Sequence, residues 1–521
     1  MKRDCAALRG RQFDLLVVGG GIYGAWTAYD AALRGLHVAI VEQGDWAGAT
    51  SSASSKLIHG GLRYLESYDF RLVRKSLRER ALLVQAAPHR VWPLRFGVPV
   101  YEDSRIGMLR MEVGLSLYDF LAPDAGPDMA HRHFKREEFS RHFPNLDSAG
   151  LKGGYTYTDA QTDDARLVLE LVSGALQAGA VCVNHCKLVG APGNVDAGYL
   201  AAVEDQLDKS TTTEIRARQI VNTTGQWMAL TEEARDWCRL TKGVHLVLPG
   251  TASAEALLLT ARSDGRVFFI IPWYGRSLLG TTDTDYNGDL DHVSVEAADV
   301  AYLLAEANHY LKTRWTEADV IGRYAGLRVM KRSDKSAPSA ASRDWALKTA
   351  RNGVHYSIGG KLTSSREDAA HIVDTVCAQL GVAVRCRTQE KAFPWAPQED
   401  FSAWRIAMNA QAARLRIDEE SAKWLLRRHG KRVGEIFRVI EADPKLAERI
   451  TPALPLVYAD LLWCARAEMV VHLGDLLRRR MPLLILATPD DSELQRLAEM
   501  IAPAMGWDAA RVKLEIETCR A

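Results

Sequence analysis

A glycine-rich turn near the start of the chain constrains its fold more than any other feature. The turn reads Gly19-Gly-Gly-Ile-Tyr-Gly24; an apolar run at residues 15–18 precedes it, and residues 22–34 follow with the apolar spacing of a helix. A second apolar run at residues 37–41 has the length of a strand. Together these segments predict a β-α-β unit, which implies a parallel sheet with a right-handed crossover.

The glycines of this turn predict a dinucleotide-binding site. Gly19 permits the tight turn, Gly21 lets a pyrophosphate approach the backbone, and Gly24 lets the helix pack closely on the strand. The phosphates then meet free N–H groups at the positive end of the helix. Glu42, at the end of the second strand, is placed to accept hydrogen bonds from ribose hydroxyls and would repel a 2′-phosphate, which disfavours NADP. The turn alone leaves FAD and NAD open.

Composition narrows the class of protein. The 521 residues exceed the roughly 250–300 at which single cores tend to split, so two or three domains are expected. A net charge of +1 does not favour nucleic acid as a partner, because nucleic-acid binding needs a strongly basic domain. Residues 1–12 lack the apolar segment of a secretory signal, and no run approaches the roughly 20 apolar residues of a membrane span. No metal site is predicted, because the cysteines are scattered and His131 and His133 lack a third ligand at a suitable spacing.

The segment after the second strand resembles a known family. It reads Thr50-Ser-Ser-Ala-Ser-Ser-Lys-Leu-Ile-His-Gly-Gly-Leu-Arg-Tyr-Leu-Glu66 and is similar to the signature of FAD-dependent glycerol-3-phosphate dehydrogenases. Further similar segments follow in order along almost the whole chain, at residues 163–167, 222–225, 242–245, 271–273, 280–283, 325–328, 342–344, 359–363, 467–469 and 475–479. The resemblance implies FAD bound without a covalent link and oxidation of sn-glycerol 3-phosphate to dihydroxyacetone phosphate. It also implies that the electrons pass to ubiquinone or menaquinone.

The rest of the chain, taken with this resemblance, predicts an α/β protein with three domains. Short β-type runs at residues 245–248, 267–271 and 277–279 indicate a mostly antiparallel sheet, interrupted by a helix near 294–312 with Ser294 as its N-cap. We expect a Rossmann-like FAD-binding domain and an antiparallel-sheet substrate domain, as in D-amino-acid oxidase and glutathione reductase, followed by a helical C-terminal domain. The predicted bounds are 1–85 plus 150–238 plus 340–388, then 86–149 plus 239–339, then 389–521.

The resemblance also implies which residues contact the cofactor. Residues 360–363 are expected to open a helix whose N-terminus faces the pyrimidine edge of the flavin and stabilises negative charge on the reduced ring. The predicted cofactor-binding residues are Gly19, Gly21, Ile22, Tyr23, Gly24, Glu42, Gln43, Thr50, Ser51, Ser55, Lys56, Leu57, His59, Gly60, Gly225, Gly360, Lys361, Leu362 and Thr363.

Oxidation of a phosphorylated alcohol needs an anion clamp and a base. Arg forks and Lys point charges suit a dianionic phosphate, and Arg63, Arg328 and Lys361 are the candidates, with Tyr64 as a neighbour and Arg343 as a further cation.

His245 is the predicted base, because the pKa of a histidine lies near the operating pH and the ring can take the hydroxyl proton as hydride leaves. A structural, hydrogen-bonded histidine is the alternative for His245. His59 competes for the role of base, but its neighbours suggest flavin contact. The predicted catalytic set is His245, Arg328 and Lys361.

One predicted helix bears on whether the protein contacts a membrane. Residues 105–122 are apolar with few acids, so this helix belongs either to the core or to a membrane headgroup region. The resemblance favours the second, since a similar region of the family is thought to meet the bilayer. We expect a cytoplasmic protein that is peripheral on the cytoplasmic face of the inner membrane; a homodimer stays open.

Several residues depart from the family pattern and leave the substrate open. Tyr23 stands in place of Asn, Trp26 in place of a small residue, and Gln226 in place of Pro. Val329-Met330 replaces Pro-Leu and Ser364-Ser365 replaces Thr-Tyr, both beside predicted substrate residues. A related polyol phosphate such as erythritol 4-phosphate is therefore an alternative substrate. An oxidase that uses oxygen, an amine or amino-acid oxidase, and a nucleotide-binding protein without turnover are the other hypotheses.

Overall fold

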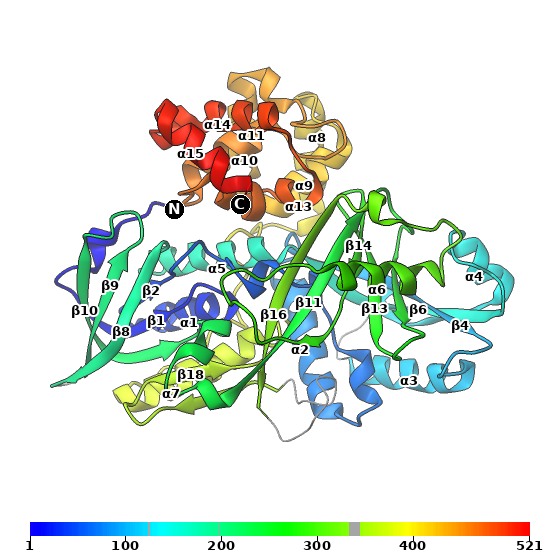
Figure 1. The fold of residues 1–521 in the computed structure, drawn as a ribbon, viewed down its shortest axis with the longest axis horizontal. Coiled ribbons are helices and arrows are strands. Elements are labelled where there is room, and N and C mark those ends of the chain that lie inside the picture. The colour runs from blue at the N-terminus through cyan, green and yellow to red at the C-terminus, as the bar shows by residue number, and fades with distance from the viewer. Residues whose placement is uncertain (123–125, 197, 333–343, 521) are drawn as a thin grey trace.

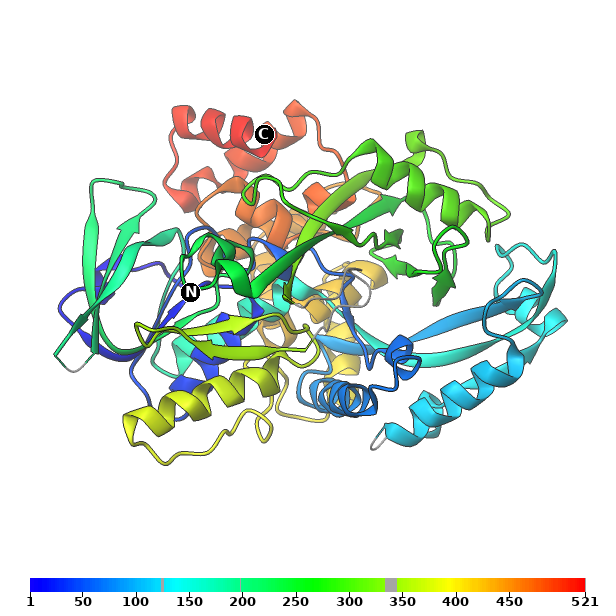
Figure 2. The ribbon, with the colours of Figure 1, turned by 60° about the horizontal axis from the view of Figure 1, so that its bottom comes forward.

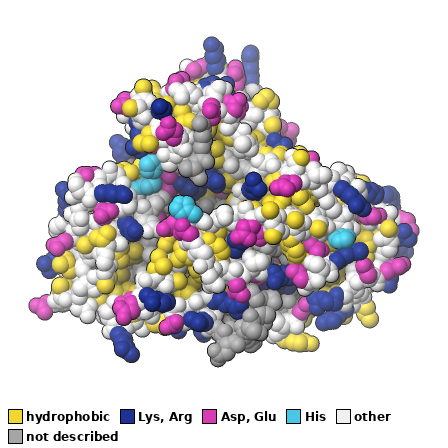
Figure 3. All heavy atoms as spheres, in the orientation of Figure 1, with side chains coloured by type: hydrophobic (Ala, Val, Ile, Leu, Met, Phe, Trp, Pro, Cys, Tyr) yellow, Lys and Arg dark blue, Asp and Glu magenta, His cyan; other side chains and the backbone are white. Residues whose placement is uncertain are grey.

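Two β-sheets lie side by side in the computed structural model, and the helices after residue 400 form a layer above both of them (Figure 1). The structure describes residues 1–122, 126–196, 198–332 and 344–520, so the predicted substrate residue Arg343 lies outside the described residues. Positive and negative side chains are interspersed over the face shown in Figure 3, as the net charge of +1 leads one to expect.

The first sheet contains the predicted β-α-β unit. Its central strands are parallel, because β1 pairs with both β2 and β10 in the same direction. Leu15 and Val17 of β1 face the packed helices α1, α5 and α7, whereas Leu16 and Val18 face the side covered by the β8–β9 hairpin. The order is β17-β18-β10-β1-β2-β7, with bounds β1 Gln12–Val18, β2 Val38–Val41, β7 Val181–Val183, β8 Cys186–Val195, β9 Gly198–Asp205, β10 Thr212–Asn222, β17 Ala346–Thr349 and β18 His355–Ile358.

The second sheet is mostly antiparallel, as predicted; β12 and β4 pair in parallel. Its path is β15-β11-β14-β13-β12-β4-β6-β3, with β16 beside β11 and β5 beside β6. The bounds are β3 Leu57–Ile58, β4 Val91–Tyr101, β5 Arg132–Lys135, β6 Leu151–Thr162, β11 Cys238–Leu248, β12 Ala256–Thr260, β13 Val267–Trp273, β14 Arg276–Gly280, β15 Thr284–Asp285 and β16 Gly322–Lys331. The domain bounds given above stay a prediction. They assign β6 to the FAD-binding domain, whereas β6 belongs to this second sheet, because it pairs with β4 along its whole length.

The helices of these two parts follow the predicted periodicity closely, with one error in capping. Their bounds are α1 Ile22–Leu33, α2 Phe70–Ala86, α3 Met108–Leu121, α4 Arg136–His142, α5 Asp164–Gln177, α6 Ala297–Asn308 and α7 Ser365–Leu380. Figure 2 shows α7 in yellow beside the β17–β18 hairpin and α3 in cyan at the edge of the molecule. Ser294 does not cap α6; the cap is Glu296, whose backbone N–H donates to Asp299 at 3.0 Å, so a carboxylate three residues on replaces the expected hydroxyl cap.

The C-terminal part is helical, as predicted, and it has an apolar core of its own that merges with the second sheet. Its helices are α8 Phe401–Arg414, α9 Glu419–His429, α10 Val433–Ala442, α11 Tyr458–Ala467, α12 Leu473–Asp475, α13 Leu483–Leu486, α14 Asp491–Met505 and α15 Ala509–Arg520. The chain's N-terminus also reaches this part, since the Met1 ammonium donates to the Ala467 carbonyl at 2.5 Å.

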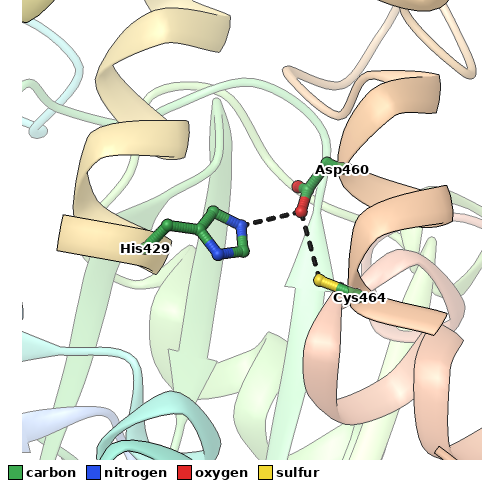
Figure 4. Close-up of side chains that lie close together, drawn as sticks. All are labelled: His429, Asp460 and Cys464. Carbon is green, nitrogen blue, oxygen red and sulfur yellow. Dashed lines mark hydrogen bonds and ion pairs between the residues drawn. The ribbon is translucent and has the colours of Figure 1, made fainter. Parts of the chain in front are cut away.

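A buried ionic cluster fastens these helices to α5. Asp460 accepts hydrogen bonds from His429 Nε2 at 2.7 Å and from Cys464 Sγ at 3.3 Å (Figure 4). Arg428 also donates to Asp460. His429 Nδ1 accepts from Arg166 Nη2 of α5 at 3.2 Å, so both ring nitrogens have partners in a neutral imidazole. Arg166 also pairs with Glu468, and all of these side chains are buried. Removing one member of such a cluster leaves an uncompensated buried charge, which typically costs about 3–5 kcal/mol.

This cluster makes the fold sensitive to acid. Burial lowers the pKa of His429 to about 4, against the opposing pull of Asp460. The unfolded chain binds a proton at this residue below about pH 6.5, whereas the folded chain does not until about pH 4, so stability is lost as the pH falls through that window, by up to about 3 kcal/mol. We expect the melting temperature to fall between pH 6.5 and 4.5, and His429→Gln to be less stable at pH 7 but to show a shallower fall. The exposed His37→Gln variant is the control; an unchanged fall in His429→Gln would contradict this assignment.

Candidate active site

One cavity of about 600 Å³ runs between the two sheets. Its lining comes from the carboxyl ends of β1, β2 and β10 on one side and from β11, β13 and β16 on the other. Ligands of α/β sheets bind at such carboxyl ends. The predicted site residues that line it are Gly19, Gly21, Ile22, Tyr23, Glu42, Gln43, Thr50, Ser51, Ser55, Leu57, His59, Arg63, Tyr64, Gly225, His245, Arg328, Gly360, Lys361, Leu362 and Thr363.

The glycine turn leaves no room for side chains. Gly19 has φ +108°, a conformation that favours glycine, and a Cβ there would lie 2.7 Å from the Thr223 carbonyl oxygen. A Cβ on Gly24 would lie 1.9 Å from the Gly19 carbonyl oxygen, so α1 packs against the turn at backbone distance. Gly24 itself does not line the cavity; its place matches the packing role predicted for it. The N-terminus of α1 at Ile22 does line the cavity, which is where a phosphate site is expected, and its Gly21 cap offers no side chain to cover it.

Glu42 lies where a ribose is expected. Its carboxylate accepts the backbone N–H groups of Gly20 at 2.5 Å and Gly44 at 2.8 Å, and burial raises its pKa. A carboxylate has about four acceptor sites, so two remain for ribose hydroxyls. The cradle therefore fits the adenosine half of a dinucleotide.

The predicted polar contacts of residues 50–56 partly serve the protein instead. The Thr50 hydroxyl donates to the Leu327 carbonyl at 2.6 Å, and the Ser51 hydroxyl accepts the Ile22 N–H at 2.9 Å. Lys56 does not line the cavity; it has φ +58° and pairs with buried Asp164 at 2.7 Å. Gly60 is also outside the lining, because Leu77 and Tyr118 pack where its Cβ would be. Thr50 and Ser51 line the cavity, whereas Lys56 and Gly60 lie behind its wall, where Lys56 is a structural cation.

Three predicted substrate residues meet at one place. Lys361 Nζ lies 3.7 Å from the centre of the Tyr64 ring, and the Arg63 guanidinium carbon lies 5.1 Å from the same centre. The two cations come from segments about 300 positions apart, so only the tertiary fold brings them to one ring. A ring face attracts cations, so Tyr64 holds both charges beside the cavity.

His245 and Arg328 form a second group on neighbouring strands. In the register of β11 and β16, His245 is opposite Tyr324, Gly243 opposite Gly326, and Thr241 opposite Arg328. The histidine and the arginine thus flank a pair of glycines on one face of the sheet. The Arg328 guanidinium lies across Gly243, where a Cβ would approach it to 2.4 Å, and it donates to Thr281 Oγ1 at 2.9 Å.

The environment of His245 corrects the expectation of a pKa near the operating pH. Burial, then the positive charges of Arg328 and Lys56, hold the pKa of His245 well below its usual value of 6.5. The ring stacks on Tyr324 with centres 5.0 Å apart, and Nε2 is 2.8 Å from Ser55 Oγ. His245 is therefore a neutral imidazole at physiological pH, which is the form that accepts a proton.

Sequence reasoning missed several cavity residues. Arg266, Phe269 and Asp283 line the cavity, and Arg266 Nη1 donates to the Asp283 carbonyl at 2.5 Å. Arg266 directly precedes the predicted strand at residues 267–271, so a cation entering a strand was the available signal. Asp283 also pairs with Arg328 at 3.3 Å, which places one acid among the cations.

The residues that depart from the family pattern are accommodated by packing. Trp26 is buried and meets the ring of Phe393 edge-on at 5.4 Å. Gln226 donates to the Leu290 carbonyl at 2.6 Å. Tyr23 and Ser364 both bond to Asp368, at 2.8 and 2.9 Å. Met330 is buried in β16. Tyr23, Gln226 and Met330 also line the cavity.

Known proteins resemble the chain over nearly its whole length. Residues 14–366 match a family model described as FAD dependent oxidoreductase, and residues 386–512 match one described as the C-terminal domain of alpha-glycerophosphate oxidase. The chain is 35% identical over 543 residues to a glycerol-3-phosphate dehydrogenase of Synechocystis sp., covering 99% of this chain and 97% of that protein. It is 32% identical to the aerobic glycerol-3-phosphate dehydrogenase of Staphylococcus saprophyticus, covering 97% and 93%.

A solved structure agrees with the fold. The X-ray structure of the glycerol-3-phosphate dehydrogenase from Bacillus halodurans complexed with FAD matches with a TM-score of 0.79 at 27% identity, covering 99% of this chain and 95% of that one. The predicted fold class and the predicted cofactor, FAD, are thereby confirmed.

The glycine turn yields a direct test of cofactor binding. In Gly24→Ala the new methyl group would overlap the Gly19 carbonyl, so α1 must move away from the phosphate turn. We expect purified Gly24→Ala to lose most of its flavin absorbance but to keep the far-UV circular dichroism of its helices. Gly114→Ala, in α3 with nothing near its Cβ, is the matched control and should keep its FAD. Full FAD content in Gly24→Ala would contradict the role of this contact.

Proposed function

Because the chain belongs to the family of FAD-dependent oxidoreductases, we propose that it oxidises sn-glycerol 3-phosphate to dihydroxyacetone phosphate and passes the electrons to a membrane quinone. The observation that carries this proposal is that one cavity connects the dinucleotide cradle with the cations at Tyr64 and with the pair His245 and Arg328. The names of the full-length relatives support the choice of substrate.

The chain's residues divide the work between binding and proton transfer. Bound FAD supplies the acceptor for the hydride from C2 of the substrate. Arg63, Lys361 and Arg328 supply positive charge for the phosphate, with the Tyr64 hydroxyl as a hydrogen-bonding neighbour. Cations that are held by cation–π contacts and by hydrogen bonds lose little further conformational freedom when the phosphate binds, which favours affinity.

His245 takes the proton of the C2 hydroxyl. The Ser55 bond and the stacking on Tyr324 hold its ring in one orientation, which a proton acceptor needs. Arg328 lowers the proton affinity of His245 before the substrate arrives. A phosphate dianion beside Arg328 offsets that charge, so substrate binding itself raises the basicity of His245.

The substrate and its clamp can be tested together. We expect anaerobic glycerol 3-phosphate to bleach the visible flavin band, and glycerol to fail. Loss of a charged hydrogen-bonding partner costs about 1.5–3 kcal/mol, so Lys361→Ala and Arg328→Ala should each lower kcat/KM by about 10- to 150-fold. Both variants should keep their FAD. Lys331→Ala, at the exposed end of β16, is the matched control. If erythritol 4-phosphate bleached the flavin band and glycerol 3-phosphate did not, erythritol 4-phosphate would be the substrate instead.

An apolar surface supports contact with a membrane. On α3, the side chains of Leu109, Val113 and Phe120 are 80, 61 and 85% exposed and share one stripe, while Leu115 and Tyr118 on the opposite face are buried. Among the described residues no helix is long and apolar enough to span a bilayer. The protein would therefore lie on the membrane, on its cytoplasmic face, with this stripe inserted.

A neighbouring segment extends this surface. Tyr68 lies just before α2 and Phe70 begins it; they are 76 and 40% exposed. Arg105, three residues before α3, pairs with Glu66 at 2.6 Å, so the two segments are tied together. Exposed Arg71 and Arg74 follow on α2. An apolar stripe bordered by arginines suits an anionic lipid surface, where a quinone dissolved in the bilayer is within reach.

Vesicle binding tests this placement. We expect the holoenzyme to sediment with anionic vesicles and to reduce quinone carried in them. A double variant, Leu109→Ser with Phe120→Ser, should lose most of its vesicle binding and of its quinone reduction, while it keeps its rate with a water-soluble electron acceptor. Ile406→Ser, which removes an exposed apolar side chain from α8, is the control. Rapid peroxide formation in air with no quinone reduction would favour an oxygen-using oxidase instead.

A further inference from the structure

Tyr23 connects the phosphate turn to the loop that carries Lys361. It is the second residue of α1, and its hydroxyl accepts the backbone N–H of Lys361 at 3.0 Å. The same hydroxyl donates to Asp368 Oδ2 of α7 at 2.8 Å. The phenol thus bonds to two segments of the chain about 340 residues from it.

Asp368 is held on its other side as well. Its side chain is fully buried, and it accepts from Lys75 Nζ of α2 at 2.6 Å and from Ser364 Oγ at 2.9 Å. A hydrogen bond to a paired, buried carboxylate is charge-assisted and therefore stronger than one between neutral groups. The Tyr23 hydroxyl is consequently fixed from one side by an anchor built from α2 and α7.

The loop runs directly against this hydroxyl. Gly360 has φ +94°, and a Cβ there would lie 1.7 Å from Tyr23 Oη. Burial and the charge of Asp368 raise the pKa of Tyr23 well above 10, so the phenol keeps its proton and remains a donor to the carboxylate. The contact with Gly360 limits how closely the loop can approach the hydroxyl. If the backbone at Lys361 moved away, the 3.0 Å bond would be lost.

We propose that Tyr23 is a positioning residue for the substrate's phosphate: its hydroxyl, held by Asp368, fixes the Lys361 backbone and so places the Lys361 ammonium against Tyr64. The inference rests on the proposed function, because it takes Lys361 as a phosphate ligand. The Lys361 Nζ lies only 3.7 Å from the Tyr64 ring centre, a position that a shift of the backbone would change. Preorganisation of this kind lowers the entropy that binding must overcome.

This arrangement also links the two ends of the cavity. Tyr23 belongs to the first turn of α1, whose N-terminus faces the phosphate site of the cofactor. The N–H of Lys361 is engaged by Tyr23, so the expected helix N-terminus at residues 360–363 is bonded to the protein at this position, and α7 begins only at Ser365.

A double-mutant cycle tests the inference in the FAD-loaded enzyme. Tyr23→Phe, Lys361→Ala and the double variant are compared for KM and kcat with glycerol 3-phosphate, for FAD content and for melting temperature. We expect Tyr23→Phe to raise KM about 10-fold with a smaller change in kcat and full FAD content. In the Lys361→Ala background, the same substitution should change KM less than about twofold, because residues that act as a unit are not additive.

The outcomes separate this inference from the proposed function. Equal effects of Tyr23→Phe with and without the Lys361 side chain would overturn the positioning role, as would a loss of FAD that accounts for the loss of activity. An unchanged KM in Lys361→Ala would overturn the proposed phosphate ligand itself, and the inference with it.

Two further variants serve as controls. Asp368→Asn keeps an acceptor for Tyr23 but removes the charge, so KM should rise by less than in Tyr23→Phe; no rise at all would contradict the anchor. Tyr29→Phe removes a hydroxyl from the same helix, outside the cavity, and should leave KM and kcat unchanged.

Discussion

The approach of α1 to the phosphate turn is the contact on which the rest of the site depends. With Gly24 against the Gly19 carbonyl at a distance that no Cβ tolerates, the first turn of α1 lies directly over the ends of β1 and β10. That placement opens the helix N-terminus to the cavity and carries Tyr23 to the loop at Lys361. A single close backbone contact therefore sets both the cofactor's phosphate site and one wall of the substrate end.

The second sheet completes the site through charge. Its strands β11 and β16 bring His245 and Arg328 to one face, separated by facing glycines, while other loops supply Arg63 and Lys361. Several cations in one cavity would repel each other, and the structure holds them by bonds to Asp283, Thr281 and the Tyr64 ring. Burial, together with the charge of Arg328, keeps His245 neutral, so a residue that binds the phosphate also helps to prepare a proton acceptor.

Much of this could be predicted from residue order. The β-α-β unit, the glycine roles and the antiparallel second sheet follow from periodicity and from backbone sterics, which are local. Errors arose where a side chain had a choice of partners. Lys56 matches a cofactor motif, yet its backbone has a positive φ and its side chain pairs with buried Asp164 behind the cavity wall. The pKa of His245 could not be foreseen either, because burial and the neighbouring Arg328 exist only in the folded chain.

By itself, the sequence determined the type of cofactor site and the order of the elements, because tight turns, strand runs and helix caps depend on neighbouring residues. Only the tertiary structure decided which side chains share the cavity. Hydrogen bonds and ion pairs between residues hundreds of positions apart, such as Tyr23 with Asp368 and Arg166 with Glu468, depend on how sheets and helices pack, and no local pattern encodes them.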